Sequence, residues 1–274
     1  MKAKKLAALL LALATLMTMC IGCGQDKTPA ADDGSSEAAG GYKEEIVIAM
    51  ADEFTTIDPM ETTAETNQIV QDCTHDLLTD TNLATMQNEG ELCESWEMVA
   101  PDDWIFKLKE GVKFHDGTIL DVDDVEFTFE RAKEHSATSN YMADIVEFIK
   151  IDDLTFEIKL AKGNVDYNYT MAANSLAILS KEAFETMSPE EAVAIGTGPW
   201  KFVEFVSGDH VTLERFDDCT LYPVPNTKRL VFRMIPEASA RMIALENGEV
   251  DVIMNPAATD YARLSESDNL QLLT

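Results

Sequence analysis

The sequence is short of positive charge. Only 21 of its 274 residues are lysine or arginine, against 50 aspartates and glutamates, so the formal net charge is −29. A surface this acidic repels the phosphate backbone of nucleic acids, which proteins bind by neutralising it with basic side chains. We therefore expect no nucleic-acid partner. Hydrophobic residues still make up 46% of the chain, enough for the core of one large domain or two smaller ones.

Metal-binding patterns are also missing. Beyond the N-terminal segment, Cys73, Cys93 and Cys219 form neither a CxxC spacing nor a Cys/His cluster, so a zinc site is not expected. Asp121, Asp123 and Asp124 resemble the start of a calcium loop, but the glycine and glutamate that complete such a loop are not at their positions. We interpret these three acids as a solvated helix start, and we expect no metal and no cofactor.

Long apolar runs are scarce as well. The run from Leu6 to Met19 follows three lysines and is too short for a membrane span, so residues 1–22 are predicted to be a signal segment. Gly22 then precedes Cys23. This pair resembles a bacterial lipobox, whose cysteine accepts diacylglycerol, although Cys20 stands where leucine is usual. We expect lipidation of Cys23, with a plain secretory signal as the alternative.

A linker follows the signal segment. Residues 23–43 are rich in Gly, Ser, Ala and Asp and lack apolar periodicity, so they are predicted to form a flexible acidic linker. Beyond it lie Cys73, Cys93 and Cys219, an odd number that leaves at least one free thiol in an exported chain. We interpret these cysteines as buried small side chains, with a Cys73–Cys93 bridge as the alternative.

Strand patterns and helix patterns alternate along the rest of the chain. Glu45–Ala51 is typical of a buried strand, Pro59 then blocks helix formation, and Thr66–Leu78 places apolar side chains on one helical face. Residues 104–109 alternate apolar and polar side chains, as a strand does, and Asp121 is placed to cap the next helix. This alternation predicts mixed α/β sheets with helices on their faces.

One stretch carries a specific resemblance. Residues 108–131, LKEGVKFHDGTILDVDDVEFTFER, resemble the signature of the extracellular solute-binding proteins of peptide and nickel ABC importers. Four further segments resemble motifs of that family in the same order: Ile57-Asp58-Pro59, Glu91–Trp96, Gly196–Trp200 and Arg241–Asp251. The resemblance extends from Ile46 to about Leu264. It implies an α/β fold, a type II periplasmic-binding-protein-like lobe of mixed β-sheets with helices on the faces.

The resemblance also bears on the residues that could suggest catalysis. It implies that His115-Asp116 is a structural turn and that Gly196 and Gly198 form a turn in which glycines can adopt positive φ. This glycine segment lacks the GxxxxGK[ST] spacing of a phosphate loop. Thr197 lies between the glycines with no histidine near it in sequence, and its spatial neighbours stay open. We expect no enzymatic activity, with a hydrolase using His115 as a minor alternative.

Family members have two lobes, and the resemblance implies that this chain holds most of the first lobe and none of the second. Within that lobe, residues 44–60 and 190–274 would form one subdomain, and residues 61–189 would form the other. Solute capture requires closure between lobes, which excludes water and strengthens polar contacts. We therefore expect this chain alone to bind peptides feebly.

By resemblance, three places line the ligand cleft: the loop after Asp58-Pro59, a position after the signature helix, and the end of the strand that follows Gly248. The residues are Thr62, Thr63, Ala64, Tyr141, Met254, Asn255 and Pro256. Backbone groups of the loop could pair with an extended ligand as an added strand does, and the Asn255 amide offers both a donor and an acceptor. The alternative is that these are ordinary loop residues.

The function that the resemblance implies is capture of a small solute outside the membrane. The expected ligand is an oligopeptide, and the expected partners are the ABC permease subunits. The protein would be a monomer, held by its lipid anchor on the outer side of the cell membrane. The alternative is a ligand-sensing or adhesion lipoprotein of the same fold that takes no part in transport.

Overall fold

The computed structural model describes residues 41–267 and 269–273. The predicted signal segment, Cys23 and most of the predicted linker lie outside the described residues. Among the described residues no helix is both long and apolar enough to cross a membrane. In the same part of the chain, no group of three or more His, Cys, Asp and Glu side chains is arranged to hold a metal ion.

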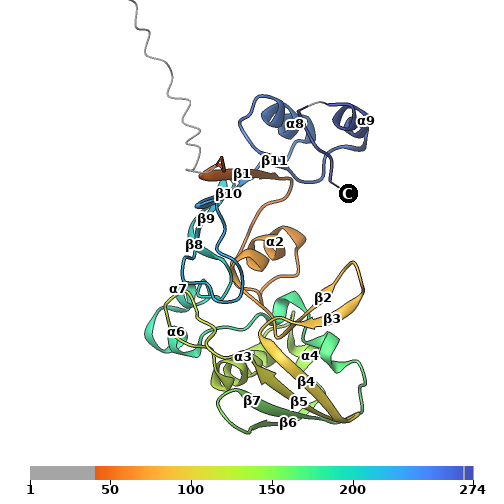
Figure 1. Cartoon of the computed structure of the whole chain (residues 1–274), viewed down its shortest axis with the longest axis vertical. Helices are drawn as coiled ribbons and strands as arrows, with labels where there is room; N and C mark the ends of the chain where they lie inside the picture. Colours follow the sequence, from red (N-terminus) through yellow and green to blue (C-terminus); the bar gives the residue numbers. More distant parts are fainter. Residues whose placement is uncertain (1–40, 268, 274) are drawn as a thin grey trace, which may run out of the picture. The chain divides into compact units, whose positions relative to one another are not determined.

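A five-stranded sheet contains strands from both ends of the described chain (Figure 1). Its strand order is β11-β1-β10-β9-β8. The strands are β1 (Glu45–Met50), β8 (Trp200–Val206), β9 (His210–Arg215), β10 (Arg229–Met234) and β11 (Val252–Ile253). Strand β1 pairs in parallel with both β10 and β11, whereas β9 runs antiparallel to β10 and β8. The carboxyl ends of three parallel strands therefore meet at one edge of this sheet.

Both faces of the five-stranded sheet carry apolar side chains, because successive residues of a strand point to opposite faces. On one face, Met50 and Phe232 pack with Val70 of helix α2 (Glu65–Thr74). On the other face, Ala49 packs with Ala244 of helix α8 (Ala238–Glu246). The sheet is thus anchored on both sides.

A four-stranded antiparallel sheet carries the largest core (Figure 1). Its strands, in the order β4-β5-β7-β6, are β4 (Cys93–Ala100), β5 (Asp103–Leu108), β6 (Ile145–Lys150) and β7 (Thr155–Leu160). Phe106 and Phe156 of this sheet stack with their ring centroids 5.4 Å apart. They belong to one buried cluster with Val125 and Phe129 of helix α3 (Val122–Glu134).

Short elements complete the described chain. A two-stranded hairpin pairs β2 (Thr79–Asn82) with β3 (Gln87–Gly90). The short helices are α4 (Ser139–Met142), α5 (Tyr167–Thr170), η1 (Asn174–Leu176), α6 (Lys181–Thr186), α7 (Pro189–Ala192), η2 (Ala258–Asp260) and α9 (Tyr261–Ser265).

The predicted cap of the signature helix is confirmed. The Asp121 carboxylate accepts a hydrogen bond from the Asp123 backbone N–H at 2.7 Å, and the Asp124 carboxylate accepts one from the Asp121 backbone N–H at 3.0 Å. This reciprocal arrangement satisfies donors that the first helical turn leaves without partners. The acids that resembled a calcium loop are therefore used in part as a helix cap.

The predicted helix over Thr66–Leu78 is shorter than expected. It begins at Glu65 and ends at Thr74, because His75 adopts an extended conformation and its ring is buried. Leu77 and Leu78 are buried although they lie beyond the helix, so the apolar pattern continues past the helix end. The buried face of α2 also includes the polar Asn67 and Gln71.

The structure corrects one expectation about glycine and excludes one alternative for the cysteines. Gly196 and Gly198 are not among the described glycines with positive φ. They allow close packing instead: a Cβ on Gly196 would lie 2.0 Å from the Thr74 carbonyl oxygen. The alternative of a Cys73–Cys93 bridge is also wrong, since both cysteines are free thiols in the structure, as is Cys219.

Candidate functional site

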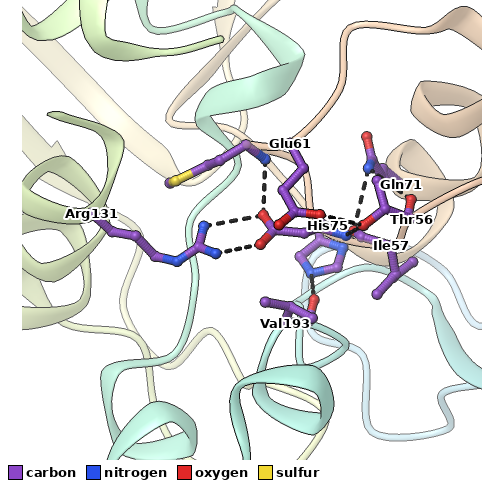
Figure 2. Close-up of polar contacts among 9 residues, drawn as sticks. Thr56, Ile57, Glu61, Gln71, His75, Arg131 and Val193 are labelled. Carbon is purple, nitrogen blue, oxygen red and sulfur yellow. Dashed lines mark hydrogen bonds and ion pairs between the residues drawn. The ribbon is translucent and has the colours of Figure 1, made fainter. Parts of the chain in front are cut away.

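The loop between β1 and α2 is fixed by a buried ion pair. Figure 2 shows the Arg131 guanidinium donating two hydrogen bonds to the Asp58 carboxylate, one of them from Nη1 to Oδ1 at 3.1 Å. The Met60 backbone N–H donates to the same Oδ1 at 3.0 Å. The side chains of Asp58 and Arg131 are only 7% and 15% exposed. Since Arg131 belongs to α3, this pair ties the loop to the helix that covers the four-stranded sheet.

Side chains of α2 hold the same loop from a second direction. Asn67 Nδ2 donates to the Thr56 carbonyl oxygen at 2.7 Å, and Gln71 Nε2 donates to the Ile57 carbonyl oxygen at 3.3 Å (Figure 2 shows the Gln71 contact). Phe54 of the same loop is buried in one cluster with Ile57 and Val70. The first part of the loop is therefore held on both sides.

Thr62, Thr63 and Ala64 lie in the second part of this loop, immediately before α2. Thr62 Oγ1 accepts a hydrogen bond from the Ala64 backbone N–H at 3.0 Å, which fixes a local turn. Thr63 and Ala64 are exposed. Ala64 occupies the N-cap position of α2, and its side chain makes no capping hydrogen bond to the backbone N–H groups of the first turn.

Met254, Asn255 and Pro256 follow the short strand β11. The Met254 backbone N–H donates to the Ala49 carbonyl oxygen at 2.9 Å, which continues the pairing with β1. Asn255 has a φ of 51°, a left-handed conformation that asparagine tolerates better than most residues. Its carbonyl oxygen accepts a hydrogen bond from Nη2 of the buried Arg241 at 3.1 Å. Arg241 Nη1 also donates to the Ile235 carbonyl oxygen at 2.8 Å, so it ties the ends of β10 and β11 together.

The structure brings two of the predicted residues to the start of α2. Met254 and Asn255 line a small recess together with Asp52, Glu65 and residues of β1 and α2. This recess lies at the carboxyl ends of parallel strands, where open α/β sheets bind ligands. Its enclosed volume is about 10 Å³, room for about one water molecule. The recess is therefore too small to enclose a peptide side chain.

A larger cavity adjoins the same segment. Its volume is about 670 Å³. The residues that line it include Met254, Asn255, Pro256, Tyr261, Leu264, Leu270, Leu272 and Leu273. The other predicted residues lie elsewhere. Thr62, Thr63 and Ala64 line neither this cavity nor the recess. Tyr141 belongs to α4, which packs against α3, and it lines neither of them.

The sequence profile of the bacterial extracellular solute-binding proteins, family 5 (middle part), matches residues 88–273. This chain belongs to that family. The oligopeptide-binding protein AppA of Bacillus subtilis is 27% identical over 100% of this chain and 52% of its own length. The dipeptide-binding protein of Escherichia coli is 28% identical over 72% of this chain and 42% of its own length. The chain spans about half the length of the curated relatives that it matches.

Solved structures agree with this assignment. AppA from Bacillus subtilis in complex with a nonapeptide superposes with a TM-score of 0.74 at 26% identity, covering 84% of this chain and 47% of that one. DppA from Helicobacter pylori in complex with the peptide STSA gives a TM-score of 0.75 at 23% identity, covering 82% and 49%. The family 5 fold of this chain is accordingly that of a type II periplasmic-binding-protein-like lobe.

His115 of this family 5 protein has the contacts of a structural residue. Its Nε2 donates to the Gly198 carbonyl oxygen at 3.0 Å, and its Nδ1 accepts from the Gly196 backbone N–H at 3.2 Å. Burial lowers the pKa of His115 below its ordinary value, which matches a neutral ring with one donor and one acceptor nitrogen. Asp116 accepts a hydrogen bond from the Thr118 backbone N–H within the same turn.

A polar cluster that sequence reasoning missed surrounds Thr197. The Thr197 hydroxyl donates to the Asp76 carboxylate, and Tyr222 Oη lies 2.7 Å from both Asp76 Oδ1 and Glu91 Oε1. Burial raises the pKa of Asp76, and burial together with the Asp76 charge raises the pKa of Glu91 to about 7. A cavity of about 490 Å³ lies beside the cluster, lined by Glu91, Tyr222 and Lys109 among others. No spacing in the sequence relates these residues.

Proposed function

We propose that this chain is the substrate-binding component of an ABC importer, which captures oligopeptides or related small solutes and delivers them to permease subunits without chemical conversion. Membership of solute-binding family 5 carries this proposal. It is supported by the names of the relatives, which include oligopeptide-binding and dipeptide-binding proteins. Haem-binding and glutathione-binding relatives also match, which is why the proposed ligand class extends beyond simple peptides.

The proposed ligand-binding face consists of Thr62, Thr63, Ala64, Met254, Asn255 and Pro256, with Tyr141 as a further contact. Two observations support it. The Asp58–Arg131 pair fixes the loop before α2, so an extended ligand would meet a backbone that loses little further entropy on binding. The Asn255 side chain is exposed at the carboxyl ends of parallel strands.

The charge around this face favours a ligand with a positive group. Asp52 and Glu65 line the recess beside Asn255, and both side chains are exposed. Glu53 and Glu61, on the same loop, are exposed as well. Four carboxylates in this region would attract the amino terminus of a peptide or a lysine side chain, within about a Debye length of 8–10 Å.

The same face is open in this chain, and that limits its affinity. An enclosed site excludes water and strengthens every polar contact, whereas an open wall leaves the ligand largely hydrated. We propose that this chain alone binds peptides with a dissociation constant weaker than micromolar. Tighter binding would require closure against a second wall.

Export and anchoring complete the proposal. Cys23 would carry a diacylglycerol anchor on the outer side of the cell membrane. The protein would be a monomer, and the acidic linker would separate its binding face from the bilayer. Growth of cells with an alkyne fatty acid tests this directly. Labelling of the wild-type chain and its loss in Cys23→Ser are expected, whereas equal labelling of Cys20→Ser and Cys23→Ser would contradict the assignment.

Peptide titration tests the binding face. We expect di- to pentapeptides at millimolar concentration to shift the amide NMR signals of residues 62–64 and 254–256. Asn255→Ala should weaken binding about fivefold, the loss of about one hydrogen bond. Asn226→Ala is a matched control, because Asn226 is exposed on another loop and should leave affinity unchanged. Micromolar affinity, or shifts confined to other residues, would contradict the proposed face.

A further inference from the structure

The hydrogen bonds around Tyr222 require one more proton than a phenol can supply. Tyr222 Oη lies 2.7 Å from Asp76 Oδ1 and 2.7 Å from Glu91 Oε1. A phenol carries a single proton, so it can donate to one carboxylate only. The second contact is a hydrogen bond only if the other carboxyl group is protonated and donates to the phenol oxygen.

The remaining carboxyl oxygens are already acceptors. Asp76 Oδ2 accepts from the Thr197 hydroxyl, and Glu91 Oε2 accepts from the Leu77 backbone N–H at 2.7 Å. The extra proton therefore belongs on Asp76 Oδ1 or Glu91 Oε1, between the two carboxyl groups and the phenol. Because Asp76 is only 2% exposed, two full negative charges at this place would be costly.

The charged groups around the cluster leave this proton in place. The charge of Lys109 acts to lower the pKa of Asp76, but burial is the larger effect and the pKa stays raised. Lys109 Nζ itself donates to the Gly90 carbonyl oxygen at 3.2 Å. The negative charge of Asp80 on β2 raises the pKa of Glu91, and Asp72 of α2 and Asp76 repel each other electrostatically. His75, next in the chain, is buried, and its pKa is lowered to about 4, so its ring is neutral. Glu89 of β3 lines the neighbouring cavity.

Tyr222 is carried by the loop between β9 and β10, residues 217–227, and the cluster is one of its attachments. Asp76 and Glu91 lie elsewhere in the fold, after α2 and before β4. The loop has other polar contacts. Arg215, at the end of β9, donates to the Asp217 carboxylate at 2.6 Å and to the Pro225 carbonyl oxygen at 2.9 Å, which holds the two ends of the loop. Lys113 contacts Asp218 at 3.6 Å and Thr220 at 3.4 Å, and these exposed contacts contribute little. The contacts of Tyr222 hold the middle of the loop.

We propose that Asp76, Glu91 and Tyr222 form a proton-dependent latch, in which one proton shared between the carboxyl groups fastens the 217–227 loop and its loss in alkaline solution releases the loop. Loss of the proton would leave two carboxylates facing one phenol, which can donate to only one of them. Movement of Tyr222 and Leu221, which line the adjacent solvent-open cavity of about 490 Å³, would then widen that cavity. The latch is independent of the proposed ligand-binding face.

The direction of the pH effect follows from the carboxyl pKa. In the folded chain the pKa of Glu91 is raised from 4.5 to about 7. A raised carboxyl pKa leaves the latch intact below about pH 5 and weakens it as pH rises through 7. The difference between a pKa of 4.5 and one of about 7 bounds the change in the loop-opening equilibrium at about 300-fold, and partial exposure of Tyr222 reduces it to an expected tenfold or more.

Glu91→Gln tests the latch, because a glutamine can accept from Leu77 N–H and donate to Tyr222 without an added proton. Hydrogen exchange of peptides covering residues 217–227 should be about equal in the wild type and Glu91→Gln at about pH 4.5, where the latch is intact. At about pH 8.5 the wild type should exchange at least tenfold faster than the variant at the same pH. Comparison at one pH cancels the intrinsic pH dependence of exchange.

Three further variants make the result decisive. Glu89→Gln removes an exposed carboxylate beside the same cavity and should behave as the wild type. Tyr222→Phe removes the bridging hydroxyl, so its loop should exchange quickly at both pH values. Asp76→Asn should reproduce Glu91→Gln if that variant fails to fold. Equal exchange of the wild type and both amide variants at about pH 8.5 would overturn the latch.

Discussion

The buried pair between Asp58 and Arg131 gives the sharpest prediction of stability. Asp58→Asn keeps the size of the side chain and keeps an oxygen for the Met60 backbone N–H. It places an amide, which cannot neutralise a charge, against a guanidinium that is 15% exposed. Removing one partner of a buried pair typically costs about 3–5 kcal/mol, because the other charge stays buried without compensation. We expect a loss of about 3 kcal/mol, since Arg131 also lies 5.3 Å from the Phe184 ring centroid and keeps that contact.

Urea unfolding at neutral pH measures this loss. With a slope of about 3 kcal/mol per M for a chain of this size, the midpoint should fall by about 1 M. A total stability of about 5–15 kcal/mol would leave the variant folded in most of that range. Amides of residues 61–66 should also exchange faster in the variant, because the pair holds the loop that precedes them.

A matched control lies on the same helix. Glu130 pairs with Lys133 at the surface, with side chains 62% and 44% exposed. Glu130→Gln should therefore cost less than about 0.5 kcal/mol. The double variant Asp58→Asn with Arg131→Met should be more stable than Asp58→Asn alone, because it removes the unpaired charge. A loss below about 1 kcal/mol for Asp58→Asn, or one equal to that of Glu130→Gln, would refute this account of the loop.

Two further predictions concern residues near the same loop. Gly196→Ala should lower the free energy of unfolding in urea by about 3 kcal/mol or more, because its Cβ would lie 2.0 Å from the Thr74 carbonyl oxygen. As a control, Gly208→Ala has open space around its Cβ but a φ of 72°, and it should lower this free energy by only about 1 kcal/mol. Equal losses for the two variants would show that close packing is not the reason. Burial lowers the pKa of His75 from 6.5 to about 4. As pH falls from 7 to 4, the free energy of unfolding of the wild type should therefore fall by up to about 3 kcal/mol relative to that of His75→Gln. Parallel curves of stability against pH for the two proteins would contradict this.

Local features of the fold were predictable because their causes lie within a few residues of one another. The strand at Glu45–Met50 follows from a short apolar run, and the cap at Asp121 follows from acids placed just before an apolar helical pattern. The family resemblance rested on such short segments in order, and the profile match over residues 88–273 confirmed it. The ligand-binding role of Thr62 and Asn255 stays a prediction.

Features that join distant segments were not predictable in the same way. Asp58 was recognised as part of a motif, but nothing in its neighbourhood points to Arg131, 73 residues away. Gly196 was expected to serve a turn, whereas it is required by the approach of the Thr74 carbonyl oxygen from another segment. Helix α2 was expected to continue to Leu78, yet it ends at Thr74, and His75 is extended and buried.

The sequence by itself determined the family, the alternation of strands and helices, and the strongly acidic character, because hydrophobic periodicity, caps and composition act locally or additively. Only the tertiary structure decided which polar groups share a buried site. It placed Tyr222 between Asp76 and Glu91, and Asn255 beside the start of α2. The physical reason is that burial and hydrogen-bond partnership depend on distances across the folded chain, which sequence separation does not encode.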